Sequence, residues 1–340
     1  MEIILPIILF ILGAVIIIKG GDLFVDAAIW MAKVTGIPDI IIGATVVSLA
    51  TTLPEFFVST IATVSGSPEI AIGNAIGSII CNTGLILAIS MMIMPVKVEK
   101  KSFMSKAFLM IASTVLLLLF STNGNINRLE GAVLAGILVY YIIQNKKEAQ
   151  MSLEINDEVA STMVEESVKA KLNKKEVSKN IIMFIVGTLF IIVGANLLVN
   201  NAQIIAKYFA VPEAIISLTV VALGTSLPEL VTALTSISKK QGGVGVGNII
   251  GANILNIVMI VSTCGIISKD GLSLTSRNIE FFGRKFINFH QTILLDIPVA
   301  LVLMLLVILP ITTYGKYTKK NGAMLLSVYV FYIGFLFITL

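Results

Sequence analysis

Two glutamates, Glu55 and Glu229, each lie inside a strongly apolar stretch and each close a similar phrase. The first phrase reads Thr51-Thr-Leu-Pro-Glu55, and the second, in the other half of the chain, reads Thr225-Ser-Leu-Pro-Glu229. Residues four apart share a helix face, so each glutamate aligns with the threonine that opens its phrase. Carboxylate and hydroxyl oxygens are hard ligands that suit Na⁺ and Ca²⁺. Because a carboxylate in lipid is costly unless a cation or proton neutralises it, the pattern indicates ion handling.

A proline in each phrase adds backbone oxygens to the same place. Pro54 and Pro228 lack an N–H donor, and each ring clashes with the carbonyl four residues earlier in a helix. Those carbonyls belong to Ala50 and Gly224. A freed carbonyl at membrane depth persists where it lines a cavity or binds a ligand. We therefore expect a broken helix in each copy, with a hydroxyl, a carboxylate and loosened carbonyls directed to one site.

A second phrase follows each glutamate at the same distance. It reads Gly73-Asn-Ala-Ile-Gly-Ser-Ile-Ile-Cys-Asn82 in the first copy and Gly247-Asn-Ile-Ile-Gly-Ala-Asn-Ile-Leu-Asn256 in the second. Its glycines, four residues apart, allow close approach between helices. Ser78 and Asn82 share a helix face in the first copy, so we expect them to add oxygen ligands, together with Asn256 in the second.

The composition places the chain in the membrane class. Hydrophobic residues make up 56% of its 340 residues and charged residues only 13%, whereas a soluble domain carries about 25% charge. The first apolar run lacks a basic start and a cleavage site, so we interpret it as a retained helix. The two cysteines lie in apolar segments, which argues against a disulfide framework. We expect the lipid bilayer and small cations as partners, and no nucleic acid.

The apolar runs predict ten membrane spans, because a spanning helix needs about 20 apolar residues. The predicted spans are 3–31, 39–64, 70–94, 104–121, 127–144, 180–207, 212–237, 244–267, 291–313 and 322–339. They form a first five-helix repeat over 1–144 and a second over 180–340, joined by a polar cytoplasmic loop over 145–179. The polar and aromatic insert at 269–291 is typical of an interfacial segment.

The odd number of spans per repeat has a topological consequence. If the connecting loop stays on one side, the second repeat enters the membrane in the opposite orientation, as in many secondary transporters. Most Lys and Arg residues fall in loops on the side of 145–179, which the positive-inside rule assigns to the cytoplasm. We therefore predict an all-α polytopic protein of the cell membrane, with ten transmembrane helices as two inverted five-helix repeats and both termini extracellular.

The two pairs of phrases resemble the α-repeats of the calcium/cation antiporter superfamily, most closely those of prokaryotic Na⁺/Ca²⁺ exchangers. The resemblance covers nearly the whole chain and implies a cluster of cation sites at mid-membrane. It implies that Ca²⁺ is bound by Glu55, Glu229, Thr51 and Thr225. It implies Na⁺ ligands among the same threonines, Thr52, Ser78, Ser226 and the carbonyls of Ser48 and Ala222, with Asn82 and Asn256 lining the centre.

Three positions depart from that family pattern. Ala252 stands where the first repeat has Ser78, so one Na⁺ site loses a hydroxyl and the Na⁺ count stays open. Asn256 stands where the K⁺-dependent branch carries an acid, which argues against K⁺ co-transport. Ala50 stands where the family often has glycine.

These observations predict a secondary active antiporter that exchanges Na⁺ for Ca²⁺ as a monomer, with no cofactor and no catalytic residue. Exchange of Ca²⁺ or another cation against protons stays open, because Glu55 or Glu229 could carry the proton. A passive cation channel could use the same oxygens, although channels usually build filters from symmetric rings. An intramembrane enzyme is disfavoured, because His290 is the only histidine and the cysteines lack metal-ligand spacing.

Overall fold

A computed structural model describes residues 3–96, 98–162, 174–209, 222–274, 276–281 and 284–339. Nearly all of this is helical, and eight of the described helices are long and apolar enough to cross a membrane. They correspond to eight of the ten predicted spans. The predicted span 127–144 falls in a further helix outside that set, while the first part of the span 212–237 and residues 163–173 of the predicted loop lie outside the described residues.

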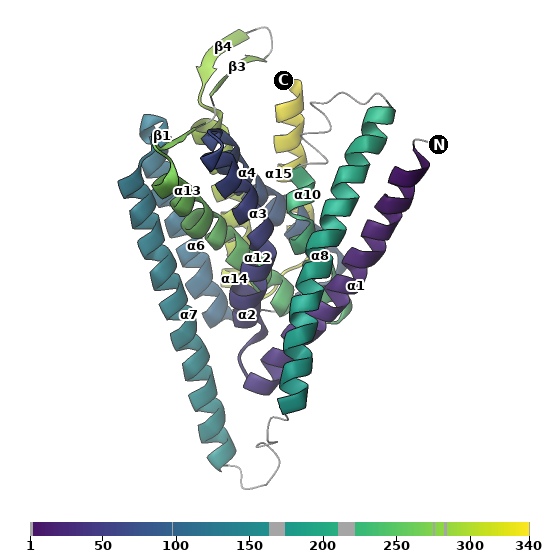
Figure 1. The fold of residues 1–340 in the computed structure, drawn as a ribbon. Helices are drawn as coiled ribbons and strands as arrows, with labels where there is room; N and C mark the ends of the chain where they lie inside the picture. Colours follow the sequence, from purple (N-terminus) through teal and green to yellow (C-terminus); the bar gives the residue numbers. More distant parts are fainter. Residues whose placement is uncertain are drawn as a thin grey trace. The chain divides into compact units, whose positions relative to one another are not determined.

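The helices follow one another along the chain as shown in Figure 1. The first half contains α1 (Ile4–Thr35), α2 (Asp39–Ile42), the π-helical turn η1 (Gly43–Val47), α3 (Ser48–Val64), α4 (Pro68–Cys81), the π-helical turn η2 (Asn82–Leu87), α5 (Ala88–Ile93), α6 (Lys100–Phe120), the short 3₁₀ turn η3 (Ser121–Asn123) and α7 (Arg128–Thr162). The second half contains α8 (Lys174–Tyr208), α10 (Ala222–Thr225), α11 (Leu227–Ser238), α12 (Gly242–Leu255), the π-helical turn η5 (Asn256–Val261), α13 (Ser262–Ile267), the π-helical turn η6 (Thr292–Asp296), α14 (Ile297–Tyr314) and α15 (Lys319–Ile338).

Four short strands among the described residues correct the all-α prediction. β1 (Asn125–Ile126) pairs antiparallel with β2 (Leu272–Ser273), and β3 (Arg277–Phe281) pairs antiparallel with β4 (Arg284–Phe289). The second pair occupies the insert predicted at 269–291. Its aromatic and β-branched residues favour extended backbone, and Ile279 lies opposite Phe286 across the pair.

Helix α7 extends beyond the predicted span 127–144 and runs to Thr162. Its continuation occupies the first part of the segment 145–179, which the sequence predicted as a connecting loop. The residues that follow 144 are rich in Lys, Glu, Gln and Met. These residues have a high intrinsic helix propensity, which does not depend on packing against other parts of the protein. The predicted membrane span therefore ends where the residues become polar, whereas the helix continues beyond that point.

The described chain divides into two compact units, Met1–Thr51 with Ile142–Asn248 and Thr52–Tyr141 with Ile249–Leu340. In the first unit, α1 and α8 lie side by side (Figure 1) and contribute Phe24 and Ile191 to the buried core. Gly20 and Gly187 face each other at this contact. A Cβ added to Gly20 would lie 2.8 Å from the Ile191 nitrogen, and one added to Gly187 would lie 2.6 Å from the Phe24 nitrogen. Glycine is therefore required for the two helices to approach this closely.

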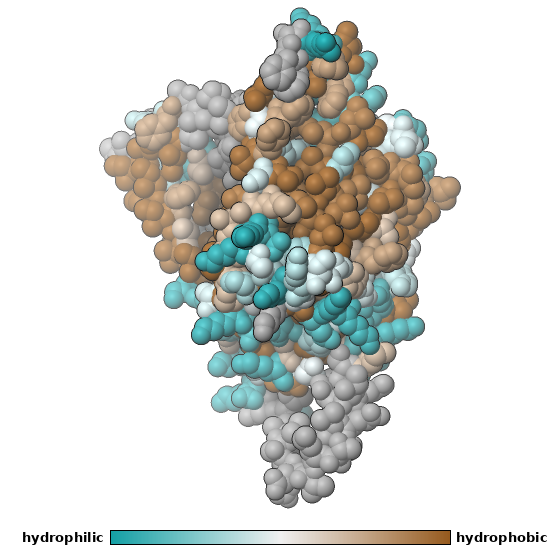
Figure 2. Space-filling model, turned by 180° about the vertical axis from the view of Figure 1, so that it is seen from behind, coloured by the Kyte–Doolittle hydropathy of each residue, from teal (hydrophilic) through white to brown (hydrophobic). Residues whose placement is uncertain are grey.

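Large apolar side chains are exposed along both helices. On α1 these include Ile4, Leu5, Ile8, Ile11 and Ile18, and on α8 they include Ile181, Ile182, Ile185 and Leu189. Figure 2 shows a face of the molecule on which hydrophobic side chains form a broad band, with hydrophilic side chains gathered beside it. A soluble protein rarely exposes so large an apolar patch, whereas a lipid-facing helix must do so.

The sequence repeat recurs in the boundaries of the helices. Helices α4 (Pro68–Cys81) and α12 (Gly242–Leu255) begin and end at equivalent positions of the two copies, with the same shift that relates Glu55 to Glu229. The π-helical turns η2 and η5, over Asn82–Leu87 and Asn256–Val261, follow at the same shift. Both turns begin on the asparagine that closes the second phrase. Isolated π-helical turns are rare and are often found at functional sites.

Candidate cation-binding site

The first copy of the glutamate phrase lies in one continuous helix. Pro54 is inside α3, which runs without interruption from Ser48 to Val64. The prediction of a broken helix is therefore wrong for this copy. Ala50, four residues before the proline, is a strong helix former, and this favours continuity across the site of the missing hydrogen bond.

The second copy contains the predicted break. Helix α10 ends at Thr225, Ser226 adopts φ −89° and ψ 8°, and α11 begins at Leu227. Pro228 consequently lies in the first turn of α11, where a backbone N–H has no partner within the helix and its loss costs little. Glu229 follows in the same turn, where the helix dipole favours a negative charge.

The first compact unit joins a threonine of the first copy to the glutamate of the second. The hydroxyl of Thr51 forms a hydrogen bond with the Glu229 carboxylate, which is 1% exposed. The same hydroxyl lies 2.9 Å from Asn248 Oδ1 and 3.3 Å from the Ser48 carbonyl, both of which can accept its proton. Three of the predicted ligands, Ser48, Thr51 and Glu229, are thus brought together, and a narrow cavity lined in part by Phe24, Thr51 and Pro228 adjoins them.

Several buried oxygens of this unit have no hydrogen-bond partner within the described chain: Ser226 Oγ, Glu229 Oε2 and Thr232 Oγ1. A buried polar atom left unsatisfied costs about 1–3 kcal/mol, so such a group of oxygens is suited to a cation. Of the other predicted ligands, Thr225 is half-buried at the end of α10, and Ala222 begins that helix.

The second compact unit holds the other predicted ligands, and all of them are buried: Thr52, Glu55, Ser78, Asn82 and Asn256. The amide of Asn82 donates to Asn253 Oδ1 at 3.3 Å, and the amide of Asn256 donates to the Ala252 carbonyl at 3.0 Å. Their own Oδ1 atoms accept no hydrogen bond from the described residues. Because the amide nitrogens are engaged by protein, each side chain presents its oxygen as an acceptor.

Thr52 Oγ1 and Ser78 Oγ are likewise buried without a partner in the described part of the chain. Within that part, no group of three or more His, Cys, Asp or Glu residues could hold a metal. Any cation held by these residues would therefore be bound by few carboxylates and many neutral oxygens, a ligand set that suits Na⁺ and Ca²⁺ rather than soft metals.

Three asparagines belong to these networks although the sequence assigned them no role. Asn248 accepts from Thr51, Asn253 donates to Thr83 Oγ1 at 2.8 Å, and Asn74 donates to Ser59 Oγ at 2.9 Å. Asn74 and Asn248 could have been found, since each directly follows the first glycine of its second phrase. Asn253 has Ile79 as its counterpart, so the repeat gave no signal for it.

A buried aspartate outside the repeated phrases was also missed. Asp296, in η6, accepts a hydrogen bond from the Tyr332 hydroxyl at 3.0 Å and from Gln291 Nε2 at 3.3 Å. Arg277 of β3 bonds to Gln291 and to Thr339, so the network reaches the base of the strand pair. The signal was available, because Asp296 is the only acidic residue in the predicted span 291–313.

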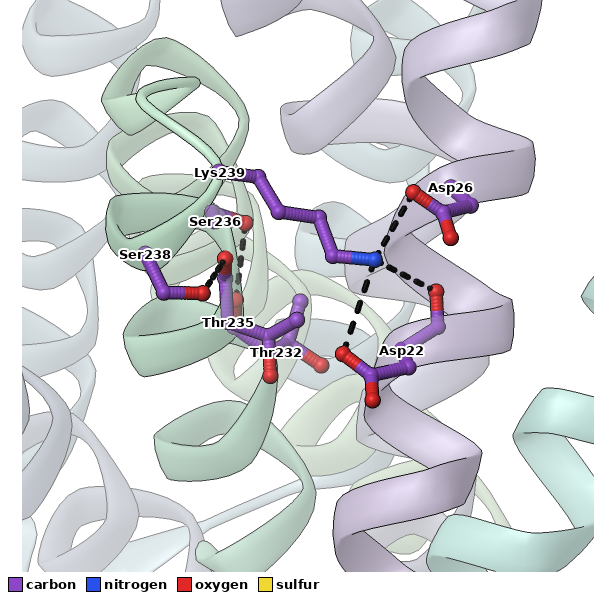
Figure 3. Close-up of polar contacts among 7 residues, drawn as sticks. All are labelled: Asp22, Asp26, Thr232, Thr235, Ser236, Ser238 and Lys239. Carbon is purple, nitrogen blue, oxygen red and sulfur yellow. Dashed lines mark hydrogen bonds and ion pairs between the residues drawn. The ribbon is translucent and has the colours of Figure 1, made fainter.

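Asp22 and Asp26 of α1 are 46% and 53% exposed and face the end of α11. Figure 3 shows Lys239 reaching both of them. Its ammonium lies 2.7 Å from Asp26 Oδ1 and 3.5 Å from Asp22 Oδ1, and it donates to the Asp22 carbonyl at 3.0 Å. The hydroxyls of Ser236 and Ser238 nearby bond to carbonyls of their own helix.

Comparison with known proteins gives consistent matches over nearly the whole chain. The family model described as sodium/calcium exchanger protein matches residues 5–145 and 179–338. The sodium/calcium exchanger MaX1 of Methanosarcina acetivorans is 26% identical, over 97% of this chain and 98% of its own. The putative antiporter CaxA of Alkalimonas amylolytica is 30% identical, over 77% of this chain and 80% of its own. A solved structure of the sodium-calcium exchanger NCX_Mj, soaked with 10 mM Na⁺ and zero Ca²⁺, is similar with a TM-score of 0.78 at 27% identity, over 98% of this chain and 99% of that chain.

Proposed function

Because the chain belongs to the sodium/calcium exchanger protein family, we propose that it is a secondary active antiporter that exchanges Na⁺ for Ca²⁺ by alternating access. It is a nearly all-helical, multi-pass membrane protein of a family of exchangers. The finer topology is part of the proposal: ten transmembrane helices in two inverted repeats, over 1–144 and 180–340, joined through a cytoplasmic segment 145–179, with both termini outside the cell. The proposed unit is a monomer in the cell membrane without a cofactor.

The proposed Ca²⁺ ligands are Glu55 and Glu229, assisted by Thr51 and Thr225. Two carboxylates balance the charge of one Ca²⁺ without a proton. The proposed Na⁺ ligands are the hydroxyls of Thr51 and Thr225 together with the neutral oxygens of Thr52, Ser78, Ser226, Asn82, Asn256 and the carbonyls of Ser48 and Ala222. Exchange then follows from competition, because Na⁺ and Ca²⁺ require overlapping sets of oxygens and each must leave before the other binds.

The observation that carries this proposal is the number of buried oxygens without a hydrogen-bond partner, among the described residues, in both copies of the phrases. Glu229 Oε2 and Ser226 Oγ represent the second copy, and Ser78 Oγ and Asn82 Oδ1 represent the first. Leaving each of them unsatisfied costs stability, so their retention together is explained by a ligand that accepts oxygen lone pairs. Na⁺ and Ca²⁺ are such ligands.

Helices α1 and α8 are the proposed moving elements of the transport cycle. They pack tightly against each other through glycines and present apolar side chains outward, so they can move as a pair without exposing a polar surface to lipid. The cavity beside Thr51 and Pro228 is bordered by both helices, through Phe24 of α1 and Ile191 of α8. A displacement of the pair would therefore change access to the Thr51 hydroxyl.

The test is uptake of ⁴⁵Ca²⁺ into proteoliposomes loaded with Na⁺, compared with vesicles loaded with K⁺ or with acid. We expect uptake that requires internal Na⁺ and that falls at least about 100-fold in Glu55→Gln and in Glu229→Gln, because each loses a carboxylate ligand. Glu69→Gln is the matched control, since Glu69 is exposed at the start of α4 and should leave uptake unchanged.

Exchange of Ca²⁺ against protons is the second candidate function. The similarity to CaxA supports it as an alternative, because that protein is named a putative antiporter without a stated ion. A carboxylate that binds Ca²⁺ can instead bind protons, so acid-loaded vesicles would drive uptake if protons were the counter-ion. Uptake driven by the pH gradient and indifferent to Na⁺ would replace the Na⁺/Ca²⁺ proposal. Uptake that needs no gradient of either ion would indicate a passive channel.

A further inference from the structure

Asn248 is fully buried on α12 and belongs to the Gly-Asn pair that opens the second phrase in both copies. Its Oδ1 lies 2.9 Å from Thr51 Oγ1, closer than the Ser48 carbonyl, which lies 3.3 Å from the same hydroxyl. The Thr51 hydroxyl also bonds to the Glu229 carboxylate. Asn248 therefore contacts a proposed ligand without being one of the ligands assigned above.

A hydroxyl group has one proton and two lone pairs, so Thr51 can donate to only one acceptor at a time. If it donates to Glu229, one carboxylate oxygen is occupied by that proton and the proton lies between two proposed ligands. A cation that needs the oxygens of both side chains would meet the proton's positive charge at close range. For a cation to bind there, the proton has to turn to another acceptor.

We infer that Asn248 is a positioning residue. When a cation binds, its Oδ1 accepts the hydrogen bond that the Thr51 hydroxyl donates, so the Thr51 oxygen and the Glu229 carboxylate stay free as ligands. This inference rests on the proposed function. Asn248 is suited to the role because its oxygen is closer to the hydroxyl than the alternative acceptor, the Ser48 carbonyl at 3.3 Å. A neutral amide also accepts the proton without introducing a further charge that would compete with Glu229 for the cation.

The equivalent asparagine of the first copy, Asn74, uses its amide differently. In the first copy, the Asn74 nitrogen donates to Ser59 Oγ at 2.9 Å and to the Glu55 carbonyl at 3.3 Å, which fixes which side of the amide faces its own glutamate helix. At the equivalent position of the second copy the bonded atom is the amide oxygen, because Asn248 Oδ1 accepts from Thr51 Oγ1 at 2.9 Å. Ser59 is replaced by Ala233 in the second copy, and the Asn248 nitrogen accordingly has no partner among the described residues.

A double-mutant cycle tests whether Asn248 acts through the Thr51 hydroxyl. Thr51→Val removes the hydroxyl at nearly constant shape, and Asn248→Ala removes the acceptor. We expect each to raise the Ca²⁺ concentration for half-maximal exchange about tenfold, as the loss of one hydrogen-bonded ligand interaction would. In the double variant the increase should be no larger than in either single variant, because without the hydroxyl there is no proton to accept.

Asn74→Ala is the matched control, because Asn74 bonds to Ser59 and to the backbone rather than to Thr51. Its effect should add to that of Thr51→Val. If Asn248→Ala and Thr51→Val are instead additive, or if Asn248→Ala lowers only the maximal rate and the thermal stability, Asn248 has a merely structural role and the inference fails. Absence of Na⁺-dependent uptake in the unaltered protein would overturn the proposed function itself, which is a separate outcome.

Discussion

The two copies of the glutamate phrase differ in backbone although their sequences are closely similar. In the first copy α3 continues through Pro54, whereas in the second the chain is interrupted at Ser226 between α10 and α11. The residue four before the proline is Ala50 in one copy and Gly224 in the other. Glycine is about 1 kcal/mol less favourable than alanine in a helix, so the same proline is tolerated in one helix and begins a new one in the other.

The side chains around the two glutamates differ as well. The first copy has Ser59 and Ser78, and the second has alanine at both counterparts but gains Thr232, where the first has Val58. Thr232 is buried and its hydroxyl has no partner among the described residues. The polar groups have therefore been redistributed between the copies. Two similar phrases therefore place different sets of oxygens around their glutamates.

Among the variants that compare the two copies, Gly224→Ala is expected to lower stability most. This substitution makes the second copy resemble the first. The added Cβ would meet the side chain of Val199, with Cγ1 at 3.0 Å and Cβ at 3.3 Å. Overpacking of this kind costs about 1–3 kcal/mol, so the thermal unfolding midpoint of the purified protein should fall by several degrees. Val199→Ala in the same chain should restore most of the loss. An unchanged midpoint in Gly224→Ala would contradict the close packing of α10 on α8.

A smaller effect is expected from Ala252→Ser, which gives the second copy the hydroxyl that Ser78 provides in the first. If the hydroxyl is a Na⁺ ligand, the Na⁺ concentration for half-maximal Ca²⁺ exchange should fall several-fold, since one hydrogen-bond-like interaction contributes about 1 kcal/mol. Ser78→Ala should raise it. Ser113→Ala, at a buried serine of α6 that bonds to its own helix, is the control. If Ser113→Ala changed the Na⁺ concentration for half-maximal exchange by a similar factor, the serine of the second phrase would have no specific role in Na⁺ binding.

The smallest effect is expected at the ion pair that only one copy possesses. Lys239 contacts Asp22 and Asp26, whereas the equivalent positions of the other copy are Ser65, Asn196 and Asn200. Both carboxylates are about half exposed, so Lys239→Gln should lower the free energy of unfolding by at most about 1 kcal/mol. The difference should vanish at about 1 M salt, where the Debye length is about 3 Å. Lys240→Gln, at the adjacent lysine, should show no such salt-dependent loss.

Much of the architecture could be predicted from apolar length and internal repetition. Eight predicted spans correspond to described helices that are long and apolar enough for a membrane, because the bilayer imposes length and composition on any helix that crosses it. The same reasoning missed the continuation of α7 to Thr162, which depends on helix propensity in polar residues rather than on lipid. It also missed β3 and β4, whose pairing depends on contacts between residues of the insert.

The candidate site could be predicted only in part. The repeat identified Glu229 and Thr51 separately, but the hydrogen bond between them joins residues from opposite halves of the sequence and depends on the tertiary fold. Asn248 was visible in the repeated phrase, yet its acceptor role toward Thr51 follows only from the packing of α12 against the start of α3. The continuity of α3 through Pro54 could not be predicted from the effect of proline alone. Proline destabilises a helix interior, but the helix persists where the interactions of the surrounding residues outweigh that destabilisation.

The paired π-helical turns have a consequence for the helices that contain them. Each turn, Asn82–Leu87 and Asn256–Val261, widens a helix locally to fit more residues than the α-helical spacing allows. Residues after the turn are therefore rotated about the helix axis relative to where a continuous α-helix would place them. Because the turns occupy equivalent positions of the two copies, both helices carry this rotation at the same point.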